Sequence, residues 1–116
     1  MPHYFIPTEA NETLTILRPM IRELMEISER IRERQPELWS VAQKSAGNGG
    51  NPALSKLLPD FDRLDFLLHQ VLDMGIEVKD LTIGLVDFPA LHEDRVVYLC
   101  WKYGEERVQF WQELET

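Results

Sequence analysis

Asp87 and Cys100 are the residues of this 116-residue sequence whose chemistry stands out from their surroundings. Asp87 is the one charge in the apolar run 83–91, and Cys100 is the only cysteine. A carboxylate beside a thiol can bind a cation or change the reactivity of the thiol, and groups with perturbed pKa values often mark functional positions. With Tyr98 and Trp111 as flat walls, they form a candidate ligand-binding set.

Each of these residues also has an ordinary structural role open to it. Asp87 can lie on a solvated sheet face or accept backbone hydrogen bonds beside Pro89, and Cys100 can be a buried, inert thiol. No histidine near Cys100 in the sequence offers a base for nucleophilic attack. The sequence therefore leaves open whether the protein is an enzyme.

A second set of possible ligands surrounds a predicted turn. His92 and Glu93 offer nitrogen and oxygen donors, and together with Asp87 they form a candidate site for a divalent metal, the one cofactor that the sequence suggests. Their spacing matches no closed metal motif, and an exposed turn is the simpler interpretation.

The strands that would position these residues follow Gly75. Hydrophobic and polar residues alternate there in segments that predict strands, namely 76–79, 83–91, 96–102 and 108–111. If Glu93 and Asp94 form a two-residue turn, Asp87 lies opposite Cys100. One face of the hairpin then carries only apolar side chains, namely Val86, Phe88, Ala90, Val97, Leu99 and Trp101. We expect this face to pack on the helices.

Two long helices are predicted before the strands. The first starts at Thr8, and its seam positions recur at steps of three and four: Ala10, Leu14, Leu17, Ile21, Leu24, Ser28, Ile31, Gln35, Leu38 and Ala42. Pro19 inside this pattern predicts a bend or a restart of the helix. The second helix follows a flexible loop at 45–51 and ends at Gly75. Its seam comprises Leu54, Leu57, Phe61, Leu64, Leu68, Val71 and Leu72.

The predicted architecture is α+β. A long antiparallel helical hairpin over about residues 8–75 is followed by a small antiparallel β-meander over about residues 76–114, in a single domain of residues 1–116. The hairpin leaves Met20, Met25 and Leu67 beside its seams as an apolar patch of a kind that monomers avoid. We therefore expect a homodimer formed through the hairpin.

Composition restricts the partners. The formal charge of -8 opposes binding to nucleic-acid phosphates and to anionic membrane surfaces, so neither is an expected partner. A single cysteine cannot form an internal disulfide, and no secretory segment is visible near Met1, so the cytoplasm is the expected location. No motif assigns a reaction.

Four blocks of the sequence are specific enough to compare with a family: residues 5–11, 75–81, 84–90, and 97–101 with the pair 110–111. They resemble the bacterial domain-of-unknown-function family 2203, and the resemblance spans nearly the whole chain. It implies a fold and no activity. The chain departs from the family pattern at Glu93-Asp94, where Asp-Gly is usual, and at Gln112, where His is common. Similar proteins continue past Thr116, so a trimmed or naturally short chain is expected.

Two classes of function remain. The first is a non-enzymatic interaction or assembly module that dimerises through the hairpin or docks a protein partner. The second is a small ligand-binding or metal-dependent protein that uses the sheet face carrying Asp87 and Cys100.

Overall fold

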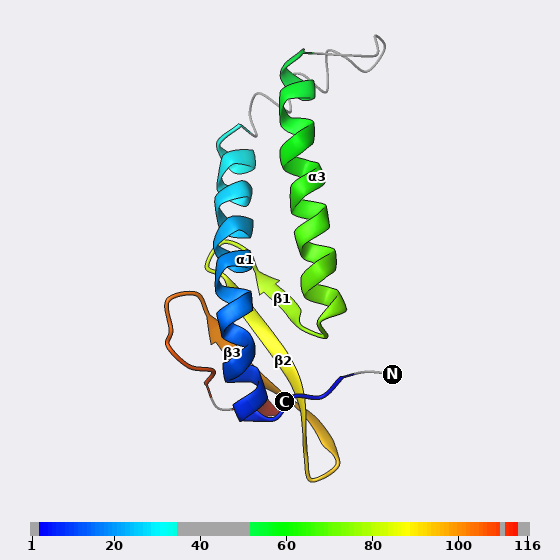
Figure 1. Cartoon of the computed structure of the whole chain (residues 1–116), viewed down its shortest axis with the longest axis vertical. Coiled ribbons are helices and arrows are strands. Elements are labelled where there is room, and N and C mark those ends of the chain that lie inside the picture. Colours follow the sequence, from blue (N-terminus) through cyan, green and yellow to red (C-terminus); the bar gives the residue numbers. More distant parts are fainter. Residues whose placement is uncertain (1–2, 35–51, 110, 114–116) are drawn as a thin grey trace.

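Two long helices lie side by side against one face of a four-stranded antiparallel sheet (Figure 1). The computed structural model describes residues 3–34, 52–109 and 111–113, with the side chains of 3–34 and 58–109. The elements are α1 (Pro7–Glu33), α3 (Pro52–Asp73), β1 (Glu77–Asp80), β2 (Leu85–His92), β3 (Arg95–Lys102) and β4 (Trp111–Glu113). The helices run antiparallel and the strands follow one another in chain order, so the predicted α+β architecture is confirmed.

Helix α1 begins one residue before the predicted start and is continuous through Pro19. The predicted alternative of a restarted helix is therefore wrong, since a proline removes only one hydrogen bond of the ladder and packing can outweigh that loss. The buried residues of α1 are Ala10, Leu14, Leu17, Ile21, Leu24 and Ile27. Ile27 takes the place in the core that was predicted for Ser28, which is half-buried. The seam positions predicted beyond Arg34, and the loop at 45–51, lie outside the described residues.

Helix α3 buries only part of the predicted seam, since Val71 is buried and Leu64 and Leu68 are partly buried against the core. Leu67 and Val71 are fully buried, whereas Phe61 and Leu72 of the predicted seam are 37% and 56% exposed. The reason is the position of α3 at the edge of the sheet, where β1 is its main contact among the strands. The buried stripe is therefore narrow and is turned toward α1.

The patch predicted from Met20, Met25 and Leu67 is covered. Leu67 is 2% exposed, and the two methionines are partly buried against the core. These residues therefore do not form the exposed apolar surface that motivated the dimer in the sequence. A different set of residues is exposed, and it is described below.

The end of α3 agrees with the sequence. Gly75 has a φ of +89°, and its N–H donates to the carbonyl oxygen of Leu72 at 2.9 Å. The N–H of Ile76 donates to the carbonyl of Val71 at 3.3 Å, which completes a Schellman motif. This closure turns the chain directly from the helix into β1.

The predicted register of the β2–β3 hairpin is confirmed. Glu93 and Asp94 form the turn with φ values of 51° and 65°, and Asp87 lies opposite Cys100. The six apolar residues of the inner face are each at most 5% exposed. The last strand lies later than predicted, at Trp111–Glu113. Val108 precedes it, and its N–H donates instead to the side chain of Asn11 in α1 at 2.7 Å.

The turn between β1 and β2 lies close to α1 at Gly84. A Cβ atom at this position would lie 2.7 Å from Cβ of Tyr103 and 2.8 Å from Sδ of Met25, and the residue has a φ of +67°. Only glycine fits this contact. The two helices are joined on their outer side by ion pairs of Arg30 with Asp60 at 3.0 Å and of Arg63 with Glu23 at 2.7 Å.

Candidate functional site

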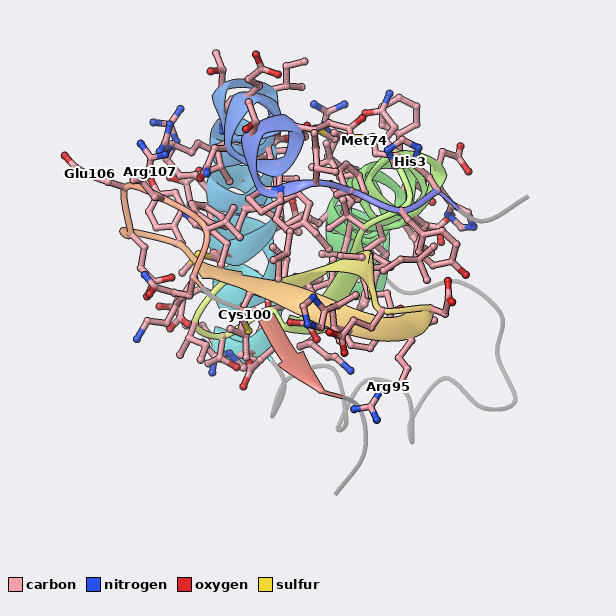
Figure 2. All side chains as sticks on the ribbon, turned by 90° about the horizontal axis from the view of Figure 1, so that it is seen from below. His3, Met74, Arg95, Cys100, Glu106 and Arg107 are labelled. Atoms are coloured by element: carbon pink, nitrogen blue, oxygen red, sulfur yellow. The ribbon has the colours of Figure 1, made fainter. Side chains whose placement is uncertain are left out.

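Asp87 and Cys100 meet on the face of the sheet that points away from the helices. The Cys100 thiol donates a hydrogen bond to Oδ1 of Asp87, with 3.1 Å between the sulfur and the oxygen. Asp87 is 7% exposed although it lies on the outer face. Figure 2 shows Cys100 below the sheet, on the side opposite the two helices. The predicted pair therefore exists and is largely shielded from water.

Strand β1 contributes two charged residues to this place. Nζ of Lys79 lies 3.7 Å from Oδ2 of Asp87 and 5.7 Å from the centre of the Tyr98 ring. Tyr98 is hydrogen-bonded to the side chain of Glu77, the residue opposite Asp87 in β1. We call these five residues, Glu77, Lys79, Asp87, Tyr98 and Cys100, the sheet-face cluster.

Burial and the neighbouring carboxylates favour the protonated forms of Cys100 and Tyr98. Burial raises the pKa of Cys100 to about 11, and the hydrogen bond to Asp87 and the charge of that residue act in the same direction. Burial, followed by the bond to Glu77, also raises the pKa of Tyr98. At neutral pH the thiol is therefore a hydrogen-bond donor and not the thiolate that nucleophilic chemistry requires.

The polar groups of the cluster bind one another. Each carboxylate oxygen of Asp87 has a partner, one in the Cys100 thiol and one in the Lys79 ammonium group. Within the described part of the chain, no buried side-chain nitrogen or oxygen lacks a hydrogen-bond partner. A cation on Asp87 would have to replace Lys79, which already supplies the positive charge.

The structure does not bring together the predicted metal ligands Asp87, His92 and Glu93. Asp87 and His92 are five residues apart in one strand, a distance of roughly 17 Å, and an odd separation places them on opposite faces. Glu93 lies in the turn beyond them. Among residues 3–34, 52–109 and 111–113, no group of three or more His, Cys, Asp or Glu side chains is placed to hold a metal ion.

The register places the remaining predicted residue, Trp111, opposite Leu99, and Gln112 is the partner of Tyr98. The side chain of Trp111 lies outside the described ones. Sequence reasoning missed Glu77 and Lys79. Extending the hairpin register to the preceding strand would have found Glu77, because it lies directly opposite Asp87. Lys79 could not be found this way, because the pairing shifts between Val78 and Asp80.

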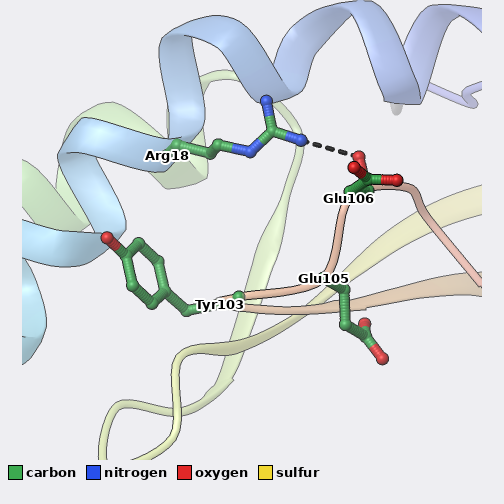
Figure 3. Close-up of a pocket in the computed structure, with 5 residues that line it drawn as sticks. Arg18, Tyr103, Glu105 and Glu106 are labelled. Atoms are coloured by element: carbon green, nitrogen blue, oxygen red, sulfur yellow. Dashed lines mark hydrogen bonds between the residues drawn. The ribbon is translucent and has the colours of Figure 1, made fainter.

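A hollow of about 420 Å³ lies away from the cluster, between α1 and the loop that follows β3 (Figure 3). Its lining includes Arg18, whose guanidinium donates to the carbonyl oxygen of Glu106 at 2.6 Å. The indole N–H of Trp101 holds the same loop through the carbonyl of Glu105 at 2.9 Å. Arg18 therefore anchors the loop to the helix, and none of the predicted ligand or metal residues lines the hollow.

A surface of another kind lies on the outer side of α3. Leu58, Phe61 and Leu72 are 51%, 37% and 56% exposed. They belong to a row at alternating steps of three and four, which we call the outer seam: Leu58, Phe61, Asp65, Leu68 and Leu72. At about 100° per residue, this row lies roughly 120° around the helix from the buried residues Leu67 and Val71 and their neighbours. Leu68 is partly buried against the core, so the exposed apolar residues of the outer seam are Leu58, Phe61 and Leu72.

Asp65, the one polar member of the outer seam, is bonded to His69 in the next turn of the same helix. The ring nitrogen Nδ1 of His69 lies 2.8 Å from the backbone carbonyl oxygen of Asp65 and 3.4 Å from its Oδ1. The hydrogen bond to the backbone of Asp65, and then the charge of Asp65, raise the pKa of His69. The pair gives local support to the helix.

The family model described as "Uncharacterized conserved protein (DUF2203)" matches residues 3–116 of the chain. The chain belongs to this family. The DUF2203 match covers the helices, the sheet-face cluster and the outer seam together. No curated protein and no solved structure matches the chain. In the described part of this DUF2203 member, no helix is long and apolar enough to cross a membrane.

Proposed function

We propose that this protein is a non-enzymatic assembly module that forms a homodimer through its helical hairpin, with the outer seam of α3 as the contact surface. The observation that carries the proposal is the exposure of Leu58, Phe61 and Leu72, which are 51%, 37% and 56% exposed in one row. Monomers rarely leave apolar side chains exposed in a contiguous stripe, and such stripes mark protein contacts.

The spacing of the outer seam supports a helical partner. Apolar residues at alternating steps of three and four match the contact row of one helix against another. Burying one leucine or phenylalanine fully contributes about 1.5–3 kcal/mol. Several such residues on each chain can offset the entropy that association costs, so the seam is sufficient for a measurable dimer.

The sheet-face cluster supports the alternative function less well. Asp87 is already paired with Lys79 at 3.7 Å and with Cys100 at 3.1 Å, so a ligand or cation would have to break existing contacts. The raised pKa of Cys100, at about 11, removes its thiolate at neutral pH. The cluster is better explained as the element that holds three strands together on their solvent side.

We place this self-association in the cytoplasm, where a chain with one unpaired cysteine and no disulfide is stable. The charge of -8 makes nucleic acid and anionic membrane unfavourable as competing partners.

The direct test is the solution mass of a matched pair of variants. Phe61→Asp places a charge in the outer seam, and Phe66→Asp makes the same change on the other flank of the same helix, where Phe66 is 51% exposed. Light scattering of the wild-type protein over a concentration series should give a mass that rises from 13.6 kDa toward twice that value. Phe61→Asp should stay monomeric, and Phe66→Asp should follow the wild type.

A wild-type protein that remains monomeric at the highest concentration would contradict the proposal. So would equal weakening by the two variants, because it would show that the outer seam is not the contact. Circular dichroism spectra that match the wild type would show that both variants are folded.

A further inference from the structure

Arg18 differs from other arginines of the two helices in what it binds. Arg30, Arg32 and Arg63 each form an ion pair with a carboxylate. Arg18 is half-buried, and its hydrogen bond is to a neutral acceptor, the backbone carbonyl oxygen of Glu106. Although the chain has 20 acidic residues against 12 basic ones, Arg18 therefore has no carboxylate partner within the part of the chain that the structure describes.

One two-donor edge of the Arg18 guanidinium remains free. A guanidinium has five N–H donors and offers two edges to a carboxylate, and each edge uses one hydrogen of Nη2. Glu106 accepts only one of the two Nη2 hydrogens, at 2.6 Å. The other hydrogen belongs to the second edge, which can bind a carboxylate through two parallel hydrogen bonds. An anion can therefore bind Arg18 without releasing the loop that Arg18 anchors.

The hollow beside Arg18 has the size of a small-molecule site and one rigid aromatic wall. Its volume of about 420 Å³ lies within the roughly 300–1,000 Å³ of pockets that hold small organic ligands. The ring of Tyr103 packs edge-on against Trp101 with 6.1 Å between the ring centres, and the N–H of Tyr103 donates to the carbonyl oxygen of Gly84 at 3.0 Å. At Gly104, which also lines the hollow, a Cβ atom would meet nothing within 4 Å. This side of the hollow is therefore open to a ligand.

The charges around the hollow determine which kind of anion fits. The side chain of Glu105 points away from Arg18 (Figure 3), and its Oε1 accepts a hydrogen bond from the N–H of Lys102 at 2.8 Å. Glu106 adds one exposed carboxylate to the lining, and the whole chain has a formal charge of -8. A ligand with two negative charges is repelled by this field more than a ligand with one. The site therefore favours a monoanion over phosphate.

From the unpaired guanidinium and the hollow beside it, we infer that this protein binds a small monocarboxylic acid, with the carboxylate on the free edge of Arg18 and a planar body against Tyr103. The two-donor contact fixes the carboxylate, and the aromatic wall adds apolar contact. Binding should be weak, with a Kd on the order of 1 mM, because the hollow is open to solvent. The inference is independent of the proposed dimer, since the outer seam lies on α3 and does not line the hollow.

The test is a titration of the wild-type protein with benzoate, followed by the amide NMR signals. Benzoate is a planar monocarboxylate, and benzamide is its neutral counterpart of nearly the same shape. Benzoate should shift the signals of Tyr103, Gly104 and Glu106 along a saturation curve, and benzamide should bind at least about tenfold more weakly. Inorganic phosphate, compared at the same ionic strength, should also bind more weakly than benzoate.

A matched pair of variants assigns the binding to Arg18. Arg18→Gln removes the guanidinium, and Arg22→Gln makes the same change about one turn further along α1, outside the lining of the hollow. Arg18→Gln should weaken benzoate binding about tenfold or more, and Arg22→Gln should change it by less than about twofold. Arg18→Lys keeps the charge without the two-donor edge, so its affinity should be intermediate. Circular dichroism spectra and melting curves check that the variants are folded.

Four results would overturn the inference. The first is the absence of a saturable shift with benzoate up to about 50 mM. The second is equal binding of benzoate and benzamide, which would show that the carboxylate is not recognised. The third is tighter binding of phosphate than of benzoate, and the fourth is equal weakening by Arg18→Gln and Arg22→Gln. The comparison of the three probes uses the wild type, so it decides the matter even if Arg18→Gln does not fold. None of these results changes the light-scattering test of the dimer.

Discussion

The outer face of the sheet and the outer side of α3 both lie away from the core, but they differ in whether their side chains have partners within the chain. On the sheet, Asp87 is 7% exposed and is bonded to Lys79 and Cys100. On α3, Leu58 and Leu72 are 51% and 56% exposed and nothing in the described chain covers them. The polar surface is satisfied within the molecule, and the apolar surface is not.

This difference changes which region of the sequence points to function. A lone Asp in an apolar strand next to a cysteine suggests chemistry, yet these residues hold one another. Leucines at helical spacing suggest core, yet part of the row remains exposed. A surface whose contacts are complete needs no ligand to explain it, whereas the exposed apolar row is the surface that the proposed dimer would cover.

The largest expected effect separates the buried residues of α3 from its exposed ones. Leu67→Ala removes a side chain that is 2% exposed and should lower the free energy of unfolding by about 2–5 kcal/mol. Leu72→Ala removes one that is 56% exposed and should change it by less than about 0.5 kcal/mol at concentrations where the protein is monomeric. Urea melts of dilute protein measure both. Similar losses would show that Leu72 is covered in the monomer.

The same contrast can be tested across the two faces of the sheet. Leu99 is 2% exposed on the inner face, and Lys102 is exposed at the end of the same strand. Leu99→Ala should cost about 2–5 kcal/mol, and Lys102→Ala should cost little. Denaturant melts with equal shifts for the two variants would mean that the faces are assigned the wrong way round.

A smaller effect concerns the sheet-face cluster itself. Because the pKa of Cys100 is raised to about 11 partly by Asp87, Asp87→Asn should lower that pKa, although burial keeps it above the ordinary value. The rate of thiol modification at about pH 9 should then rise severalfold. Lys79→Ala should have the reverse effect, since the charge of Lys79 lowers the pKa of Cys100. An unchanged rate in Asp87→Asn would show that the carboxylate does not act on the thiol.

The raised pKa of Cys100, which is hydrogen-bonded to Asp87, also predicts that stability depends on pH. A thiol whose pKa is raised on folding stabilises the folded state fully below its unfolded pKa of about 8.5. That contribution should be lost as the pH rises toward about 11. Cys100→Ser should lack this part of the alkaline decline, which urea melts at a series of pH values would reveal.

The smallest expected effect is at His69. The pKa of its ring is raised by Asp65, so its contribution to stability is present below the unfolded value of about 6.5 and is lost as the pH rises through the folded value. The side chain is 67% exposed, and solvent screening keeps the effect small. His69→Gln should flatten the change in melting temperature over this range. An identical profile in wild type and variant would remove His69 from the account.

The hairpin register was predictable because two features of the sequence agree on it. A two-residue turn at Glu93-Asp94 and the alternation of apolar residues from Val86 to Trp101 both place Asp87 opposite Cys100. The end of α3 was predictable for a similar reason, since Gly75 supplies the positive φ that closes the helix.

The faces of the helices were only partly predictable. Steps of three and four identify an apolar row, but they do not say how wide a stripe the rest of the fold covers. Because α3 lies at the edge of the sheet, Leu67 became core and Leu72 remained exposed. Lys79 entered the cluster through an irregularity in strand pairing that alternation alone cannot reveal. The partners of Asp87 were therefore only partly visible in the sequence.

The most direct measurement of the central claim is a dilution series followed by methyl NMR spectra. If the outer seam is the contact between chains, the methyl signals of Leu58 and Leu72 should move with concentration. The signals of Leu85 and Leu91 on the outer face of the sheet, and of Leu17 in the core, should stay fixed. Movement at Leu91 with no movement at Leu58 or Leu72 would place the interface on the sheet and contradict the account, as would spectra that do not change with concentration at all.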